Sequence, residues 1–327
     1  MADDCGEFRL DKPGPWGIPD KSKPAAEWKD VMQEIPVLDQ GQTGLCYAYT
    51  ASQLVDAFYG QKQKTSAIAA AVFARADDWG FSRWLRKNSI GNLVDGGWTC
   101  QTIDALKEKG ACPMSLVDTD YLRRTIAAYS NDIKEVVKFA KNNPEQYQCV
   151  KVNELIPDQL SEMIKLGDKL EDYNNMQTLE LMIKNGCREQ LTSLPEKLEC
   201  HDFVARVDYK TEVMPKMNIS ATDVAAKKYK AKINQLFSRP APLQPLGLAF
   251  CSSILTGNKD CGLHAAMIIG RRKKTSTGKC QYLIRNSWGT DCSNYKRGVK
   301  CENGNLWVDD NELEQNMTKI NYLELKK

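Results

Sequence analysis

The chain has 327 residues, of which 42% are hydrophobic and 27% charged, which is typical of a globular protein with a sizeable core. Its formal net charge of +3 is too small and too dispersed to indicate nucleic-acid binding. No apolar run approaches the roughly 20 residues that a transmembrane helix needs. We therefore expect neither a nucleic-acid partner nor a membrane span.

Cysteine content points to an oxidising compartment. Twelve cysteines are more than a cytosolic enzyme usually carries, so disulfides and a secreted or periplasmic, extracytoplasmic location are expected. The first residues, Met1 to Asp4, have neither a basic nor an apolar signal region. We expect a mature end with an added initiator methionine.

The N-terminal third contains an arm and three predicted helices. Residues 1–30 carry four prolines among charges and are expected to form an extended arm. A glycine-punctuated loop precedes Cys46, after which apolar residues recur at helical spacing until Gly60, and 67–76 (AIAAAVFARA) is a second short helix. The turn-rich stretch 92–98 is followed by a third helix.

That third helix has recognisable end signals. Thr99 is the expected N-cap and Gly110 the expected stop. Before it, Gly96 and Gly97 would let another backbone approach closely.

The position of Cys46 suggests a reactive thiol. A cysteine in the first turn of a helix lies where unpaired backbone N–H groups and the macrodipole stabilise a thiolate. A buried structural cysteine needs neither, so Cys46 is a candidate nucleophile.

The rest of the chain divides into a helical part and a strand part. From about 118 to 240 the sequence is lysine-rich and indicates an amphipathic helical insertion, with helices at 121–142, 158–185 and 221–237, the second ending before Gly186. A surface that gates or binds substrate is the alternative reading of this insertion. The last third predicts short apolar strands at 245–251, 264–271, 279–286 and 305–309, with a hairpin turn at KKTSTG.

Only two histidines, His201 and His264, are available as a base for Cys46. We interpret His201 as structural, because a zinc site with Cys200 would need two more ligands and the nearest cysteine is too far along the chain. His264 opens a strand, from which an imidazole can project. No metal or cofactor is expected.

A third element supports His264 as the base. Asn286 stands in the stretch Arg285–Thr290, and an amide oxygen can accept a hydrogen bond from the imidazole and fix its tautomer and ring plane. The neighbouring Trp288 could shield that bond from water.

These residues, in this order, resemble the papain-like cysteine peptidases: Gln40 and Cys46, then Gly96-Gly97, then His264, then Asn286-Ser287-Trp288-Gly289. The resemblance implies an α+β, two-lobed fold. Its helical N-terminal lobe would be 31–117 and its antiparallel β-sheet or barrel lobe 241–327, separated by the insertion at about 118–240 within a peptidase domain of 31–327.

The resemblance also implies catalytic roles. Cys46 would be the nucleophile, and His264 the general base and then acid. Asn286 would orient His264, and Trp288 would cover that contact. Gln40 would donate to the oxyanion hole together with the Cys46 backbone N–H.

Substrate-binding residues follow from the same resemblance: Gly96, Gly97, Leu246, Ala249, Leu263 and Trp288. The two glycines would bind the substrate backbone as an extended strand. The leucines and the alanine would line a pocket for an apolar side chain, two residues before the scissile bond. Protein or peptide would be the substrate, and a proteinaceous inhibitor is a further partner to consider.

The sequence departs from the family in three respects. Around the nucleophile it reads Thr43-Gly44-Leu45-Cys46-Tyr47 instead of C-G-[SA]-C-[WY]. The family's disulfide partner before the Gly-Gly pair is also absent, so no orphan cysteine results. The separation of Cys46 from His264 exceeds the about 130–150 residues usual in the family, and the insertion accounts for the surplus.

Disulfide pairs can be suggested only from the proximity of cysteines in the sequence. Four pairs of cysteines close in sequence are expected: Cys292–Cys301, Cys251–Cys261, Cys100–Cys112 and Cys187–Cys200.

Two alternatives to a peptidase stay open. One is a papain-fold binding protein that has lost turnover and uses the insertion as its interaction surface. The other keeps the thiol chemistry on a different bond, as in an amidase, a transpeptidase or a cell-wall hydrolase.

Overall fold

A computed structural model describes the chain at residues 7–11, 32–33, 35–41, 43–59, 63–76, 96–117, 175–204, 223–238, 244–258, 261–274 and 276–326. The chain divides into two compact units. Unit 1 comprises Met1–Gly41, Asp56–Gly60 and Cys200–Glu324, and unit 2 comprises Gln42–Val55, Gln61–Glu199 and Leu325–Lys327. An antiparallel sheet combined with several helices confirms the α+β class.

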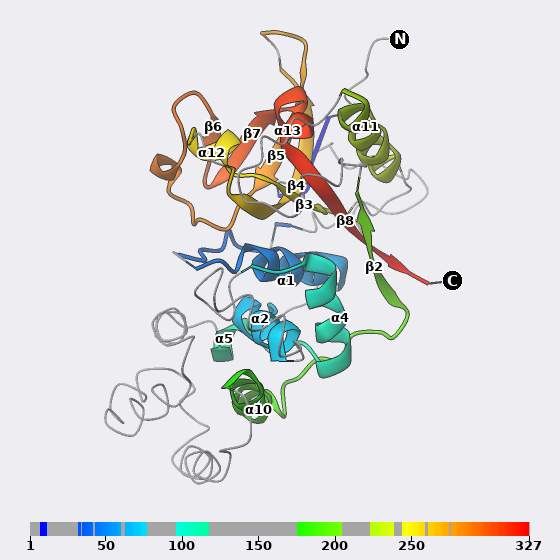
Figure 1. Cartoon of the computed structure of the whole chain (residues 1–327), viewed down its shortest axis with the longest axis vertical. Coiled ribbons are helices and arrows are strands. Elements are labelled where there is room, and N and C mark those ends of the chain that lie inside the picture. The colour runs from blue at the N-terminus through cyan, green and yellow to red at the C-terminus, as the bar shows by residue number, and fades with distance from the viewer. Residues whose placement is uncertain are drawn as a thin grey trace. The chain divides into compact units, whose positions relative to one another are not determined.

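An eight-stranded sheet forms the centre of unit 1 (Figure 1). Its order is β2-β8-β3-β4-β5-β7-β6, and β1 pairs with β4 in addition. The strands are β1 (Phe8–Arg9), β2 (Leu198–Phe203), β3 (Leu246–Cys251), β4 (Leu263–Lys273), β5 (Cys280–Arg285), β6 (Lys300–Glu302), β7 (Asn305–Asp309) and β8 (Met317–Leu325).

Burial explains why the central strands read as continuous apolar runs. Every residue of β5 is buried, and the middle of β4 is buried as well. Such strands pack on both faces, so their sequences lose the alternation of a half-exposed strand. The predicted strands 245–251, 264–271, 279–286 and 305–309 are confirmed as β3, β4, β5 and β7.

Unit 1 also contains the helices α11 (Asp223–Phe237), α12 (Ser253–Thr256) and α13 (Asp310–Asn316) and the 3-10 helix η3 (Cys292–Asn294). Of these, α13 packs against β3, β5 and β7 of the sheet, and α11 packs against α13. The Phe8 ring of β1 meets the Phe237 ring of α11 at 4.5 Å between centroids. The first strand of the chain thus contributes to the core of the C-terminal sheet.

Unit 2 is helical, with α2, α4, α5 and α10 gathered together in Figure 1. The helices are α1 (Cys46–Tyr59), α2 (Ala67–Ala76), α4 (Thr99–Lys109), α5 (Met114–Val117) and α10 (Asn175–Cys187). Both predicted helices at 46–59 and 67–76 are confirmed. All ten residues of α2 are buried, because its alanines let neighbouring helices approach closely.

Covalent and polar contacts tie α10 to the rest of unit 2. The Cys112–Cys187 disulfide joins its last residue to the chain before α5. On α4, the Lys109 ammonium lies 3.2 Å from the Glu180 carboxylate of α10 and donates to the Phe73 carbonyl of α2 at 3.0 Å. A cation placed between an anion and a carbonyl is satisfied although it is buried.

Two predicted disulfides are confirmed and two are wrong. Cys292–Cys301 and Cys251–Cys261 form as expected. Cys112 bonds to Cys187 rather than to Cys100, which also rules out Cys187–Cys200. Sequence proximity identified short turn-closing bridges but could not identify a bridge across 75 residues.

Helix ends also differ from the prediction. The N-cap of α4 is Trp98 rather than Thr99, which is already helical, whereas Gly110 ends the helix as predicted. Gly186 does not stop α10, which continues to Cys187, where the disulfide holds its last turn. The predicted helix 121–142 and most of the arm 1–30 lie outside the described residues.

Every helix in the described part of the chain is too short or too polar to traverse a bilayer.

Candidate active site

His264 lies near the start of β4 in unit 1, opposite Phe250 of β3. It is 6% exposed, and its ring is held between Phe250 and Trp288, at 5.6 and 4.9 Å between centroids. Burial disfavours the charged imidazolium and lowers the pKa of His264 to about 4, while the hydrogen bond to Asn286 acts in the opposite direction. Burial therefore favours the neutral imidazole.

Asn286, immediately after β5, fixes the tautomer of that imidazole. Its Oδ1 lies 2.6 Å from His264 Nε2 and also accepts the Ser287 backbone N–H at 2.8 Å. An amide oxygen can only accept, so Nε2 carries the proton. In the neutral ring, Nδ1 is then the nitrogen with the lone pair, which is the atom available to take a proton from another group.

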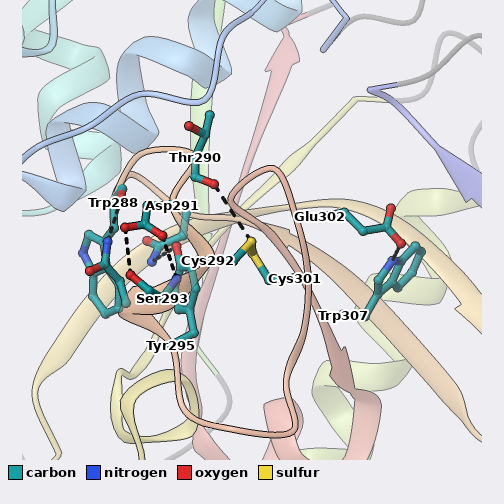
Figure 2. Close-up of a disulfide and its surroundings, with 11 residues drawn as sticks. Trp288, Thr290, Asp291, Cys292, Ser293, Tyr295, Cys301, Glu302 and Trp307 are labelled. Carbon is teal, nitrogen blue, oxygen red and sulfur yellow. Dashed lines mark hydrogen bonds between the residues drawn. A yellow bond between two sulfur atoms is a disulfide. The ribbon is translucent and has the colours of Figure 1, made fainter.

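Two aromatic side chains enclose this pair. Trp288 lies over His264, and Tyr295 stacks on Trp288 at 5.6 Å between centroids with 17° between their planes. Figure 2 shows Trp288 and Tyr295 near the Cys292–Cys301 disulfide, which closes the loop that carries Tyr295. The Asn286 side chain is fully buried, so water does not compete for the bond to His264.

Gln40 belongs to the same cluster. Its backbone N–H donates to the Ser287 carbonyl at 2.8 Å, and its Oε1 accepts from the Ser287 hydroxyl at 2.5 Å. Gln40 is only 4% exposed. Because Ser287 occupies the amide oxygen, the orientation of the Gln40 amide is fixed, with the Nε2 donor at the opposite end.

Buried Arg285 anchors the segment that leads to Gln40. Its guanidinium donates to the carbonyls of Met32 and Ile35, at 3.2 and 2.5 Å, and to Asn305 Oδ1 at 3.2 Å. Burial lowers the pKa of Arg285 to about 10, which still leaves it charged at neutral pH. One strand end therefore presents Asn286 to His264 and holds the chain before Gln40.

Cys46 and the glycine pair lie in unit 2. Cys46 is the first residue of α1, is half-buried and is not in a disulfide. Gly96 donates its N–H to the carbonyl of Gly44, two residues before the cysteine, at 3.0 Å. The turn with the two glycines is thus bonded to the loop that precedes Cys46.

Arg75 and Tyr47 pack against this turn. The buried Arg75 guanidinium donates to the Gly96 carbonyl and lies 5.1 Å from the Tyr47 ring centroid. A Cβ on Gly97 would collide with both side chains, so only glycine fits there. Gly96 has φ 68°, which also favours glycine.

The residues predicted to line a pocket divide between two faces of the sheet. Leu246 is 3% exposed in the core, Ala249 is half-buried, and Leu263 is 56% exposed. The register of β3 with β4 puts Leu246 on the face of His264, and Ala249 with Leu263 on the other face. These lining roles stay predictions.

His201 has a structural environment on β2. Its Nε2 lies 3.3 Å from the Glu324 carboxylate, and its ring stacks on Tyr322 at 5.1 Å between centroids. Cys200 is in a disulfide and so is unsuitable as a zinc ligand. Within the described ranges no His, Cys, Asp and Glu cluster could hold a metal ion.

Of the predicted site residues, unit 1 brings together Gln40, His264, Asn286 and Trp288, and unit 2 brings together the Cys46 loop, Gly96 and Gly97. Sequence reasoning missed four supporting residues: Ser287, Tyr295, Arg285 and Arg75. Only Arg285 and Ser287 had a signal, because they flank Asn286 in the stretch Arg285–Thr290.

No protein-family model matches the chain, and neither does any curated protein. Among solved structures, digestive procathepsin L 3 of Tenebrio molitor matches at 14% identity and TM-score 0.41, over 89% of this chain and 66% of that one. Bromelain from Ananas comosus matches at 14% identity and TM-score 0.39, over 89% and 94%. The ragweed pollen allergen Amb a 11, a cysteine protease in its proform, matches at 11% identity and TM-score 0.44, over 89% and 63%. Likenesses at this level do not establish the activity of the chain.

Proposed function

We propose that this protein is a cysteine peptidase that hydrolyses peptide bonds through an acyl-thioester on Cys46. The observation that carries the proposal is the 2.6 Å hydrogen bond between His264 Nε2 and buried Asn286 Oδ1. It fixes the tautomer with Nδ1 as proton acceptor, which is what a general base for a thiol requires.

The two ionisation states of His264 have separate roles in the proposed reaction. Nδ1 takes the Cys46 proton, and the thiolate attacks the carbonyl carbon of the peptide bond. The imidazolium then gives that proton to the leaving amine nitrogen as the carbon–nitrogen bond breaks. In deacylation, Nδ1 takes a proton from water as the water oxygen attacks the thioester carbon. The carbon–sulfur bond then breaks, the proton passes from Nδ1 to the Cys46 thiolate, and a free carboxylic acid is released.

Burial of His264 favours the neutral base, and in the proposed reaction the negative charge of the Cys46 thiolate would offset the cost of the buried imidazolium. Cys46 at the N-terminus of α1 adds the favourable helix dipole.

Gln40 and the glycine pair complete the proposed site. The Gln40 Nε2 and the Cys46 backbone N–H would donate to the oxyanion of the tetrahedral intermediate. Since Ser287 already holds the Gln40 amide, this donor needs little reorganisation when negative charge develops. Gly96 and Gly97 would bind the substrate backbone, and the disulfides support an extracytoplasmic location.

Hydrolysis of a fluorogenic peptide library by the wild type and by Cys46→Ala tests the proposal. We expect turnover by the wild type and none by the variant above background, with both folded by circular dichroism. Asn286→Ala should lower kcat less than His264→Ala, because the first loosens an orientation and the second removes the proton carrier. Absence of cleavage with an intact fold would favour a silent binding protein, and transfer to added amines would favour a transpeptidase.

A further inference from the structure

The loop between Asn286 and β6 bonds to the amide end of Asn286 that faces away from His264. Asn286 Nδ2 donates to the Tyr295 hydroxyl at 3.3 Å. Tyr295 is buried, although the residues before it in the loop are exposed. A buried phenol in an exposed loop indicates a specific packing role.

The Asn286 amide has a single satisfactory orientation. The Ser287 backbone N–H points at Oδ1, and a backbone N–H can only donate. If the amide turned over, its NH2 would face that donor. A phenol hydroxyl can donate or accept, so the Ser287 N–H selects the orientation that presents Oδ1 to His264, and the bond to Tyr295 holds the amide in that place.

Tyr295 also reaches His264 through Trp288. It stacks on Trp288, and Trp288 lies over the imidazole at 4.9 Å. Tyr295 therefore acts on the His264 imidazole in two ways: through its hydrogen bond to Asn286 and through its packing against Trp288. Loss of the hydroxyl alone would remove only the first contact.

Short-range contacts fix the loop that carries Tyr295. The Cys292–Cys301 disulfide closes it, and the Asp291 carboxylate accepts from the backbone N–H and the hydroxyl of Ser293, both at 2.8 Å (Figure 2). On the other side of Tyr295, the Lys296 backbone N–H donates to the Leu255 carbonyl at 2.8 Å.

We propose that Tyr295 is a positioning residue for the His264–Asn286 pair, held in place by the loop that Cys292–Cys301 closes. The inference rests on the proposed function in that His264 is taken as the base. Burial raises the pKa of Tyr295 to about 12, so the hydroxyl stays protonated and neutral over the working range of a cysteine peptidase.

Solvent exchange of the His264 Nε2 proton, followed by NMR, tests this without any need for peptidase activity. In Tyr295→Phe, which keeps the ring and loses the hydroxyl, we expect exchange about twofold to tenfold faster, as for loss of one hydrogen bond. The matched control is Tyr322→Phe, whose ring stacks on the other histidine, and it should leave the His264 proton unchanged. Equal exchange in the two variants would overturn the proposal.

A double-mutant cycle separates positioning through Asn286 from a general effect on folding. Tyr295→Phe should lower kcat by about twofold to tenfold in the wild type with KM unchanged, and by nothing further in Asn286→Ala. Additive losses would overturn the role assigned to Tyr295. The Cys292→Ser, Cys301→Ser double variant should show the same faster exchange as Tyr295→Phe, and unchanged exchange would overturn the role of the closed loop.

If no variant of the chain cleaves peptides while Tyr295→Phe still accelerates His264 exchange, the proposed function fails and the positioning role of Tyr295 stands.

Discussion

The pH dependence of stability should show how strongly burial acts on His264. Cys46→Ala is the background of choice, because it removes the thiolate that would stabilise an imidazolium. Burial lowers the pKa of His264 from 6.5 to about 4. The unfolded chain therefore binds a proton between these two values that the folded chain does not bind.

This difference in proton binding makes the folded chain less stable as the pH falls. The contribution of neutral His264 to stability is fully present above pH 6.5, is lost as the pH falls towards 4, and changes no further below 4. At about 1.4 kcal/mol for each pKa unit, the loss is roughly 3 kcal/mol.

Denaturant unfolding from pH 7.5 to 4 in Cys46→Ala, with and without His264→Gln, measures this contribution. Most other titrating groups cancel in the difference between the two variants, which should shrink by roughly 3 kcal/mol across the range. A difference that is independent of pH would refute the reasoning, as would an NMR titration of His264 in Cys46→Ala with a midpoint at or above 6.5.

Three further predictions concern the surroundings of the site. Ser287→Ala removes the hydroxyl that holds Gln40. In steady-state kinetics it should lower kcat about twofold to tenfold with KM nearly constant. A change confined to KM would contradict the role of Ser287 in holding Gln40. Gly97→Ala should lower the free energy of unfolding, measured by denaturant titration, by about 1–3 kcal/mol, because the added Cβ has no room. Gly186→Ala, where the space is open, should be neutral or stabilising. Equal effects of the two substitutions would contradict the packing around Gly97. Cys187→Ser opens a bridge across 75 residues and should destabilise by about 4 kcal/mol in calorimetry, so an unchanged transition would show that the bridge contributes little.

Local sequence patterns predicted the helices and strands whose bounds depend on nearby residues. The helices 46–59 and 67–76 and the strand 305–309 have the predicted bounds, because periodicity and flanking turn residues determine them. The strand β8 was missed, since Met317–Leu325 mixes lysine, asparagine and glutamate with its apolar residues. Pairing with β3 stabilises it, and pairing partners cannot be read from a single segment.

For the site, the order of motifs predicted the contact between His264 and Asn286 but not the residues that support it. Tyr295 belongs to no recognisable motif and reaches Asn286 through a disulfide-closed loop. Arg75 lies inside an alanine-rich helix, where a single arginine would ordinarily be assigned to the solvent face, and yet it is buried beside Gly96. Both contacts depend on the folded arrangement rather than on local sequence.

The alkylation rate of Cys46 tests the central claim most directly. Iodoacetamide labelling, quantified on the Cys46 peptide by mass spectrometry between pH 5 and 9, reports the thiolate fraction. At pH 6 we predict labelling on the order of tenfold or more faster than a model thiol, and a rate in His264→Gln that falls most of the way towards the model rate, since only the helix N-terminus then stabilises the thiolate. A pH–rate curve that matches an ordinary thiol and does not change in His264→Gln would contradict the account.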